Sequence, residues 1–525
     1  MMPAGFDSLL RLALRRDRRL IVLWTIGNVL LFVSQGWSVD RLYTTQQEFD
    51  DAAAAMADNP ALVAMTGPAR ALNTTGGQVA WQAGAFGVIV AGLMAMLIIG
   101  RHTRVEEESG RDELVRAGVV DRRSPVLAAA AVAAIANVVM GVGIAASLLA
   151  YGLPAAGSLS LGLGTALCGM LFGAFTLVAA QLFVTTRAVY ALAGAFMAAA
   201  YAVRAVGDVT GGELSWLSPI GWAQAMRAYS GERWWPAWLF VVATAGLLIA
   251  ALALFDARDA GAGTLTRSGP ARRARRPPRS ALGLAWRLER NAVAGWAVGM
   301  FIGGLAYGSV GDDVGDVVGS SDLSRDLLGA GSADLVDAFY ATAALILALV
   351  CCGFAIAAVL RPGADESSGV ADQLLATPLT RRRWGASTWA VALIGSVVLI
   401  LAGGLGLGLG LALATGDSCH LPSLVGATAV QGAAVWCLAA VAALAYGVSR
   451  SSGPWVWGYF AYVLVVALFA EVLSLPDWAI ALSPFEHLPA APAEDVTALP
   501  ILGVVAVSAV LMLGGLQLLR RRDLG

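Results

Sequence analysis

The sequence has 525 residues, of which 58% are hydrophobic and only 14% are charged, and its mean hydropathy is +0.71. Soluble domains carry about 25% charged residues, so this composition excludes an ordinary soluble domain and indicates a polytopic membrane protein. The formal net charge is only -1, and we expect no nucleic-acid partner.

Membrane spans account for most of the chain. A transmembrane helix needs about 20 apolar residues to cross roughly 30 Å of hydrocarbon. Residues 124–186 contain neither a charged residue nor a histidine, so this stretch is expected to cross twice, with a turn near 151–157. The same criterion predicts an all-α fold of about 12 transmembrane helices, centred near residues 30, 90, 138, 172, 198, 246, 301, 348, 400, 434, 463 and 509.

An amphipathic pattern precedes the first span. Phe6, Leu9, Leu10 and Ala13 share one face of a helix, and arginines occupy much of the remaining surface. This pattern predicts an interfacial helix that lies on the membrane and leads into the span. A signal peptide is the alternative, but no small-residue cleavage pattern follows the apolar run.

A strongly charged segment, GRHTRVEEESGRDELVRAGVVDRR at 100–123, separates the second and third spans. A charge at the bilayer centre costs roughly 3 kcal/mol, so the segment is expected to lie in water beside the membrane. Its acidic residues come before its last basic residues, which suits the two ends of a helix dipole. A similar segment, RPGADESSGVADQLLATPLTRRR, occurs at 361–383. Each of the two segments is predicted to form an exposed amphipathic helix that contacts a soluble partner. The alternative is a solvated loop whose charges only set the orientation of the protein in the membrane.

The two charged segments belong to an internal duplication. LALRRDRRLIVLW at 12–24 resembles LAWRLERNAVAGW at 284–296, and RDAG at 258–261 resembles RDLG at 522–525. We therefore predict two halves that each contain six spans in the same order. Because six is even, the halves share an orientation and are related by a pseudo-twofold axis along the membrane normal.

The predicted domains are the first six-span half at 1–256, a Gly-, Pro- and Arg-rich linker at 257–281 and the second half at 282–525. All 35 basic residues are arginines, and most of them fall in the N-terminus, the charged segments, the linker and the C-terminus. Positive charge accumulates in cytoplasmic loops. Both termini are therefore predicted to be cytoplasmic, in a multi-pass protein of the plasma (inner) membrane.

The absence of lysine restricts how the protein uses energy. The nucleotide-binding motif G-x-x-x-x-G-K-[S/T] needs a lysine to reach the phosphates, and the chain contains none. Moreover, its soluble stretches are too short for a nucleotide-binding domain. We therefore expect no enzymatic activity and no bound cofactor in this chain, and we expect any ATP hydrolysis to occur on a separate subunit.

The run RHTRVEEESGRDEL at 101–114, with six spans per half and an amphipathic helix before the first, resembles the permease subunit of ABC exporters of the second class. The similarity is to actinobacterial polyketide-antibiotic and multidrug exporters whose two halves are fused in one chain, and it covers essentially the whole length. The resemblance implies that the segment is a coupling helix, which rests in a cleft of an ATPase subunit. It also implies two ATPase subunits per permease chain, with ATP and Mg bound by those subunits.

The resemblance assigns the ATPase contact to specific residues. In the first half these are Glu106, Glu107, Gly110, Arg111, Glu113 and Leu114. In the second half the pattern is weaker and leaves Glu366, Gly369, Gln373 and Leu374. Arg111 has no basic counterpart there, and prolines interrupt the run, so we expect the two contacts to be unequal.

Polar side chains inside the spans are candidates for the substrate pathway. They are Asn28, Gln82, Asn137, Gln181 and Gln431. The alternative for each is a hydrogen bond to a neighbouring helix. Charges are nearly absent from the predicted membrane interior, which favours a hydrophobic or amphiphilic solute. The resemblance implies that this solute is an antibiotic or drug and that it is exported, and we expect transport by alternating access. A proton-coupled secondary multidrug carrier is the alternative function, but such carriers normally place ionisable residues inside the bundle.

Two further stretches carry structural predictions. GGLGLGLGLALATG at 403–416 alternates as a strand does, but an open strand in lipid leaves backbone groups unpaired, so we predict a helix whose glycines allow close packing. For LSPIGWAQAMRAYSGERWWPAW at 217–238, the same resemblance implies short helices that dip into the outer leaflet. The alternative is an ordinary belt of interfacial aromatic residues.

Overall fold

The computed structural model describes residues 3–43, 45–57, 60–111, 113, 117–258, 263, 280–319, 332–470 and 476–522. Over these ranges the chain forms α-helices and short 3-10 helices and no β-strand. Within them, 12 helices are long and apolar enough to cross a membrane, which confirms the predicted all-α polytopic fold. The chain divides into two compact units, Met1–Arg272 and Arg273–Gly525.

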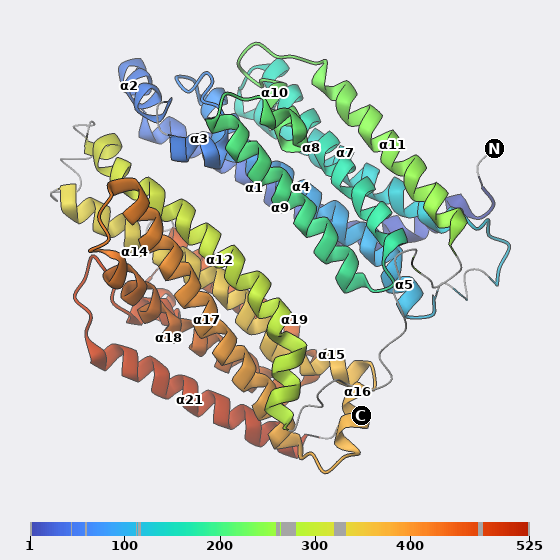
Figure 1. Cartoon of the computed structure of the whole chain (residues 1–525), viewed down its shortest axis with the longest axis vertical. Helices are drawn as coiled ribbons and strands as arrows, with labels where there is room; N and C mark the ends of the chain where they lie inside the picture. Colours follow the sequence, from blue (N-terminus) through green and yellow to red (C-terminus); the bar gives the residue numbers. More distant parts are fainter. Residues whose placement is uncertain are drawn as a thin grey trace. The chain divides into compact units, whose positions relative to one another are not determined.

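The first unit contains six of the membrane-length helices. They are α1 (Phe6–Leu42), α4 (Thr75–His102), α7 (Ser124–Tyr151), α8 (Ala155–Leu182), α9 (Thr186–Val209) and α11 (Pro236–Ala257). The short elements are α2 (Gln46–Ala57) and α3 (Pro60–Thr66) before α4, α5 (Arg104–Glu108) after it, and η1 (Leu214–Leu217) and α10 (Pro219–Ala225) before α11. Figure 1 shows the long helices of this unit running alongside one another.

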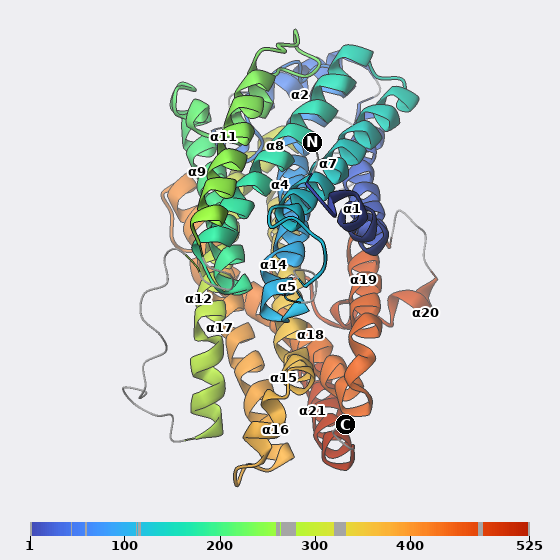
Figure 2. The ribbon, with the colours of Figure 1, turned by 90° about the vertical axis from the view of Figure 1, so that its right-hand side faces the viewer.

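The second unit repeats this order. Its long helices are α12 (Ala281–Gly319), α14 (Ser332–Leu360), α17 (Arg381–Thr415), α18 (Leu421–Val448), α19 (Gly453–Phe469) and α21 (Ala498–Arg521). The short elements are α15 (Pro362–Ser367) and α16 (Val370–Leu375) after α14, η2 (Arg450–Ser452) before α19, and α20 (Asp477–Ile480) and η3 (Pro484–His487) before α21. Figure 2 shows α15 and α16 at the end of this unit that also holds the C-terminus.

The predicted turn at 151–157 joins α7 to α8. Gly152 follows the last residue of α7 and has a φ of +101°, a left-handed conformation that glycine adopts without a steric penalty. Pro154 then precedes the first residue of α8. Within the unit, α4 and α8 are the most enclosed of the long helices, whereas α11 presents most of its apolar surface outward, as a lipid-facing helix does.

The glycine-rich stretch 403–416 is helical, as predicted, and lies almost entirely in α17. Its glycines pack against α12. A Cβ atom added at Gly406 would lie 2.1 Å from the carbonyl oxygen of Phe301, and one added at Gly410 would lie 2.4 Å from that of Leu305. The two helices therefore approach backbone to backbone, as small residues permit in membranes.

The amphipathic N-terminal segment leads into the first span as one continuous helix, while its position on the membrane surface stays a prediction. α1 runs without a break over 37 residues. At 1.5 Å per residue it is about 55 Å long, so it extends well beyond a hydrocarbon core of roughly 30 Å. The extended end makes a buried contact: Asp17 is fully buried and pairs with Arg101 and His102 at the end of α4.

The connecting stretches are described only in part. Residues 312–337 contain seven aspartates and one arginine. α12 covers the beginning of this stretch and α14 its end, and the residues between the two helices lie outside the described ranges. Most of the predicted linker 257–281 also lies outside them. The stretch 217–238 contains the short helix α10, as predicted, while its depth in the membrane stays a prediction.

Candidate functional site

The charged segment of the first unit begins directly at the end of α4. Thr103 leaves the helical conformation, with φ -120° and ψ -91°, and its Oγ1 donates to the Ile99 carbonyl oxygen at 2.6 Å. α5 follows and ends shortly before Gly110, whose φ of +70° is left-handed. The chain therefore turns at both ends of α5, and this sets the α5 side chains against the ends of other helices.

Glu107 lies against the interior of the unit, and its side chain is only 11% exposed. Its Oε2 accepts from Arg104 Nη1 at 2.8 Å and from Arg258 Nη1 at 3.2 Å. Arg258, which directly follows α11, is 3% exposed and also donates from Nε to Gln181 Oε1 at 2.8 Å. A buried charge is costly unless it is paired, so this cluster holds the segment after α4 to the ends of α8 and α11.

The second unit contains the same arrangement. Glu366 of α15 is 7% exposed and pairs with Arg522, which directly follows α21. Tyr446 donates its hydroxyl proton to the same carboxylate. Arg258 and Arg522 begin the repeated RDAG and RDLG sequences, and the two glutamates occupy matching places in the charged segments. We call Glu107–Arg258 and Glu366–Arg522 the anchor pairs.

A second contact involves the acidic residue shared by the repeated sequences LALRRDR at 12–18 and LAWRLER at 284–290. Asp17 in α1 lies with its Oδ1 2.9 Å from Arg101 Nη1, and its Oδ2 contacts His102. The matching acid of the second unit, Glu289, pairs with Arg361. In both units an acidic residue of the first long helix thus binds a basic residue at the end of the second.

The other predicted ATPase contacts of the first unit lie nearer the surface. Glu106 pairs with Arg16 and lies 3.8 Å from Arg111 Nη1. The side chain of Arg111 is 61% exposed, and Glu113 is exposed as well. Leu114 lies outside the described residues. The segment therefore has a buried face that ends in an anchor pair and an exposed face that carries Arg111 and Glu113.

In the second unit, Gly369 has a φ of +73°, which matches the left-handed glycine of the first. Gln373 in α16 is exposed and Leu374 is half-buried. The sequence prediction missed Arg258 and Arg522, although the repeat of RDAG and RDLG was a signal that could have identified them. It did not show that each arginine folds back onto a glutamate more than a hundred residues earlier in the chain.

The polar residues predicted for the substrate pathway lie within helix packing. Asn28 and Asn137 are buried and donate to backbone carbonyls at 3.0 and 2.8 Å. Gln82 donates to a neighbouring glutamine at 2.7 Å and Gln431 to a backbone carbonyl at 3.4 Å. Gln181 belongs to the first anchor cluster. Their assignment to a pathway stays a prediction.

A cavity of about 260 Å³ opens beside the first anchor pair. Its lining combines apolar residues with charged ones: Leu9, Leu12, Ala13, Val126 and Phe255 with Arg16, Glu106, Glu107 and Arg258. The matching place in the second unit holds a cavity of about 40 Å³, which Leu374, Trp384 and Thr388 help to line. The repeated contacts are thus conserved between the units, whereas the space beside them is not.

The described residues form two sets of six membrane-length helices. In each set, an anchored charged segment follows the second helix. This architecture is that of a multi-pass membrane permease. Residues 279–520 match the family model described as multidrug efflux system permease Rv1217c, C-terminal domain. Over 524 residues the chain is 37% identical to the multidrug efflux system permease protein Rv1217c of Mycobacterium tuberculosis (strain ATCC 25618 / H37Rv), and the match covers 99% of this chain and 95% of that protein. The chain belongs to this family of efflux permeases, which confirms the resemblance found in the sequence.

Proposed function

We propose that this chain is the transmembrane permease subunit of an ATP-driven ABC exporter that moves hydrophobic or amphiphilic small molecules, such as antibiotics and drugs, out of the cell. The mycobacterial relative is named as a permease of a multidrug efflux system, and identity over nearly the full length supports the same role here. The observation that carries the proposal is the anchor pair, which recurs in both units beside the segment that resembles a coupling helix.

The anchor pairs suit the transmission of force from a motor outside the membrane. Each joins a charged segment to the end of the sixth long helix of its unit. A push on the first segment would therefore move α4, α8 and α11 together. Breaking a buried ion pair leaves an uncompensated charge, so the linkage resists separation. In this mechanism each segment acts as a lever that shifts its six-helix half between inward- and outward-facing states.

Two ABC ATPase subunits bind the permease in this proposal, one at each charged segment, and they hold ATP and Mg. The exposed Arg111 and Glu113 supply the first docking surface, and Gln373 and Leu374 contribute to the second. The burial of Glu107 favours a role inside the permease over direct docking. The arginine-rich segments favour the cytoplasmic side, so we place both termini in the cytoplasm and the chain in the plasma membrane.

Reconstitution tests this function. The chain is purified together with any ATPase that a neighbouring gene encodes and inserted into liposomes, and movement of a fluorescent amphiphilic dye is followed after addition of ATP or after imposition of a proton gradient. Movement that requires ATP and both subunits is the expected result. Movement by the permease alone, driven by the proton gradient, would contradict the proposal and establish the proton-coupled carrier instead.

A further inference from the structure

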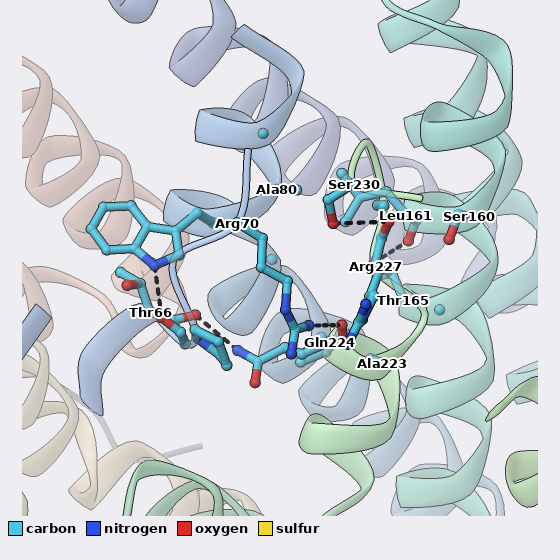
Figure 3. Close-up of a pocket in the computed structure, with 18 of the residues that line it drawn as sticks. Thr66, Arg70, Ala80, Ser160, Leu161, Thr165, Ala223, Gln224, Arg227 and Ser230 are labelled. Carbon is cyan, nitrogen blue, oxygen red and sulfur yellow. Dashed lines mark hydrogen bonds between the residues drawn. The ribbon is translucent and has the colours of Figure 1, made fainter. Parts of the chain in front are cut away.

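At the end of α4 opposite to α5, the first unit contains a cavity of about 60 Å³, which we call the outer cavity. Its walls come from the loop between α3 and α4, from α4 and α8, and from α10 and the residues that follow it (Figure 3). Its polar lining includes Thr66, Arg70, Ser160, Gln224 and Arg227. This volume fits several waters or one small acidic group, whereas pockets for whole drug-sized ligands measure about 300–1,000 Å³.

Hydrogen bonds between separate elements hold the walls of this outer cavity. Trp81 Nε1 donates to the carbonyl oxygen of Gly67 at 2.7 Å, and Gln224 Nε2 donates to that of Thr66 at 2.8 Å. A Cβ atom at Gly67 would lie 2.2 Å from Gln224 Nε2, so a side chain at position 67 would have to displace the Gln224 amide from its hydrogen bond. These contacts tie α4 and α10 to the loop between α3 and α4, which together form part of the cavity wall.

Left-handed backbone occurs at one residue that lines the outer cavity, Arg227, and at two residues next to lining residues in the chain, Ala71 and Tyr229. Ala71, Arg227 and Tyr229 have φ values of 49°, 52° and 61°, and among the described residues they are the non-glycine residues with positive φ. A residue with a side chain pays a steric penalty in this conformation, and such strain tends to cluster at functional sites. Glycine would fit position 227 at a lower cost, so the strain points to a use for the Arg227 guanidinium.

Positive charge dominates the lining of the outer cavity. Arg70 and Arg227 are the ionisable residues among those that line it, and Arg70 Nη1 donates to a neutral acceptor, the Gln224 carbonyl oxygen, at 2.9 Å. Burial lowers the pKa of Arg70, and the nearby charges of Arg227 and Arg233 lower it further. Asp208 opposes this shift, but it already forms an ion pair within α9. Two half-buried arginines therefore line a cavity whose described lining residues include no carboxylate.

We propose that the outer cavity binds the acidic group, a carboxylate or a phosphate, of an anionic amphiphile. Guanidinium groups recognise such oxyanions through charge-assisted hydrogen bonds. The cavity is too small for the rest of the molecule, and Val88, Leu161 and Ile220 make part of its wall apolar, so the apolar body extends outside it. An exported solute and a membrane lipid share this chemistry. The outward orientation of this end rests on the proposed function, but the binding itself does not.

Thermal unfolding of the full-length chain in an uncharged maltoside detergent tests the proposal. Dodecyl phosphate is the probe, and inorganic phosphate and dodecyltrimethylammonium are the comparisons. We expect a saturable rise of the unfolding midpoint with dodecyl phosphate, a weaker response to inorganic phosphate and none to the cation. Equal responses to the anionic and cationic amphiphiles would contradict an acid-specific site.

Arg227→Gly provides the sharpest variant. Its unfolding midpoint without ligand should rise, because glycine adopts this φ freely. Its affinity for dodecyl phosphate should fall about tenfold or more, because a charge-assisted hydrogen bond is lost. Arg233→Gln is the matched control, since Arg233 is exposed in the same loop and does not line the cavity. It should bind as the unaltered chain does.

Unchanged affinity in Arg227→Gly, or an equal loss in Arg233→Gln, would overturn the proposal. Nanodiscs then distinguish the two sources of the acidic group. If phosphatidylglycerol abolishes the response that is seen in pure phosphatidylcholine, a lipid headgroup occupies the site; if the response persists, the ligand is a solute. Because no ATPase is present, a failure of ATP-driven export would leave these results unaffected.

Discussion

The two charged segments share one repeated pattern but differ in how they are anchored. Glu107 in the first unit binds two guanidiniums, those of Arg104 and Arg258, whereas Glu366 in the second binds one guanidinium and one tyrosine hydroxyl. The neighbouring cavity measures about 260 Å³ in the first unit and about 40 Å³ in the second. The carboxylate-to-arginine contact is thus present in both units, while its surroundings differ. Under the proposed function, the two halves would therefore respond unequally when an ATPase subunit moves each charged segment by the same amount.

The anchor carboxylates are those of Glu107 and Glu366, and neutralising Glu107 is expected to lower the free energy of unfolding more than the other changes proposed below. Glu107→Gln removes the charge that two buried guanidiniums share. We therefore expect the free energy of unfolding to fall by about 3–5 kcal/mol, the range for breaking a buried ion pair. Glu366→Gln affects one guanidinium, that of Arg522, which is 13% exposed, and we expect a loss of about 1–3 kcal/mol. Unfolding midpoints of the two variants, measured side by side in detergent, check this order.

Glu113→Gln is the control for these anchor variants, because it makes the same charge change on an exposed side chain of the first segment. We expect it to alter the free energy of unfolding by no more than about 0.5 kcal/mol. Equal losses in all three variants would mean that the net charge of the segments, rather than the anchor pairs, determines stability.

The next comparison concerns Asp17 and Glu289, the acidic residues that the first long helix of each unit contributes to the end of the second. Asp17→Asn should cost about 2–3 kcal/mol, because a fully buried carboxylate loses its charge beside Arg101 and His102. Glu289→Gln should cost about 1 kcal/mol, since its partner Arg361 is 28% exposed. Hydrogen exchange over the first turns of α1 and α12 measures both losses. Unchanged protection of α1 in Asp17→Asn would show that this contact does not hold the extended end of the helix.

The unequal cavities can be tested by filling them. Ala128 and Thr388 occupy matching positions and line the larger and the smaller cavity, respectively. Thr388→Leu should cost about 1–3 kcal/mol, because it adds volume where little space exists. Ala128→Leu should be neutral or stabilise by about 0.5–2 kcal/mol, as cavity-filling changes commonly do. Unfolding midpoints provide the comparison, and equal costs would show that the cavities do not differ in usable volume.

The fold was largely predictable from the sequence, because the length and polarity of each apolar run are local properties. The repeat predicted six helices per half, and the glycine run at 403–416 required a helix for backbone reasons alone. The anchor pairs were not predictable, because Arg258 reaches Glu107 only after α7, α8, α9 and α11 have packed. The left-handed backbone of Arg227 and Tyr229 also has no sequence signal, since glycine or asparagine normally marks such a position. The repeats showed which residues recur in both halves, but they did not show which of these residues form contacts or what each one binds.

Arg111 is expected to show the smallest change in stability and to report on docking alone. Its side chain is 61% exposed, so Arg111→Ala should alter the free energy of unfolding by no more than about 0.5 kcal/mol. If it contacts the ATPase, affinity should fall about two- to tenfold, with a weaker salt dependence, as for a charge at the rim of an interface. Val370→Arg places a guanidinium at the matching, exposed position of the second segment and should bring the two ATPase affinities closer together. Titration of the ATPase at two salt concentrations measures both effects. An Arg111→Ala permease that keeps its affinity and its salt dependence would remove Arg111 from the docking surface, and the two segments would then differ in their anchors alone.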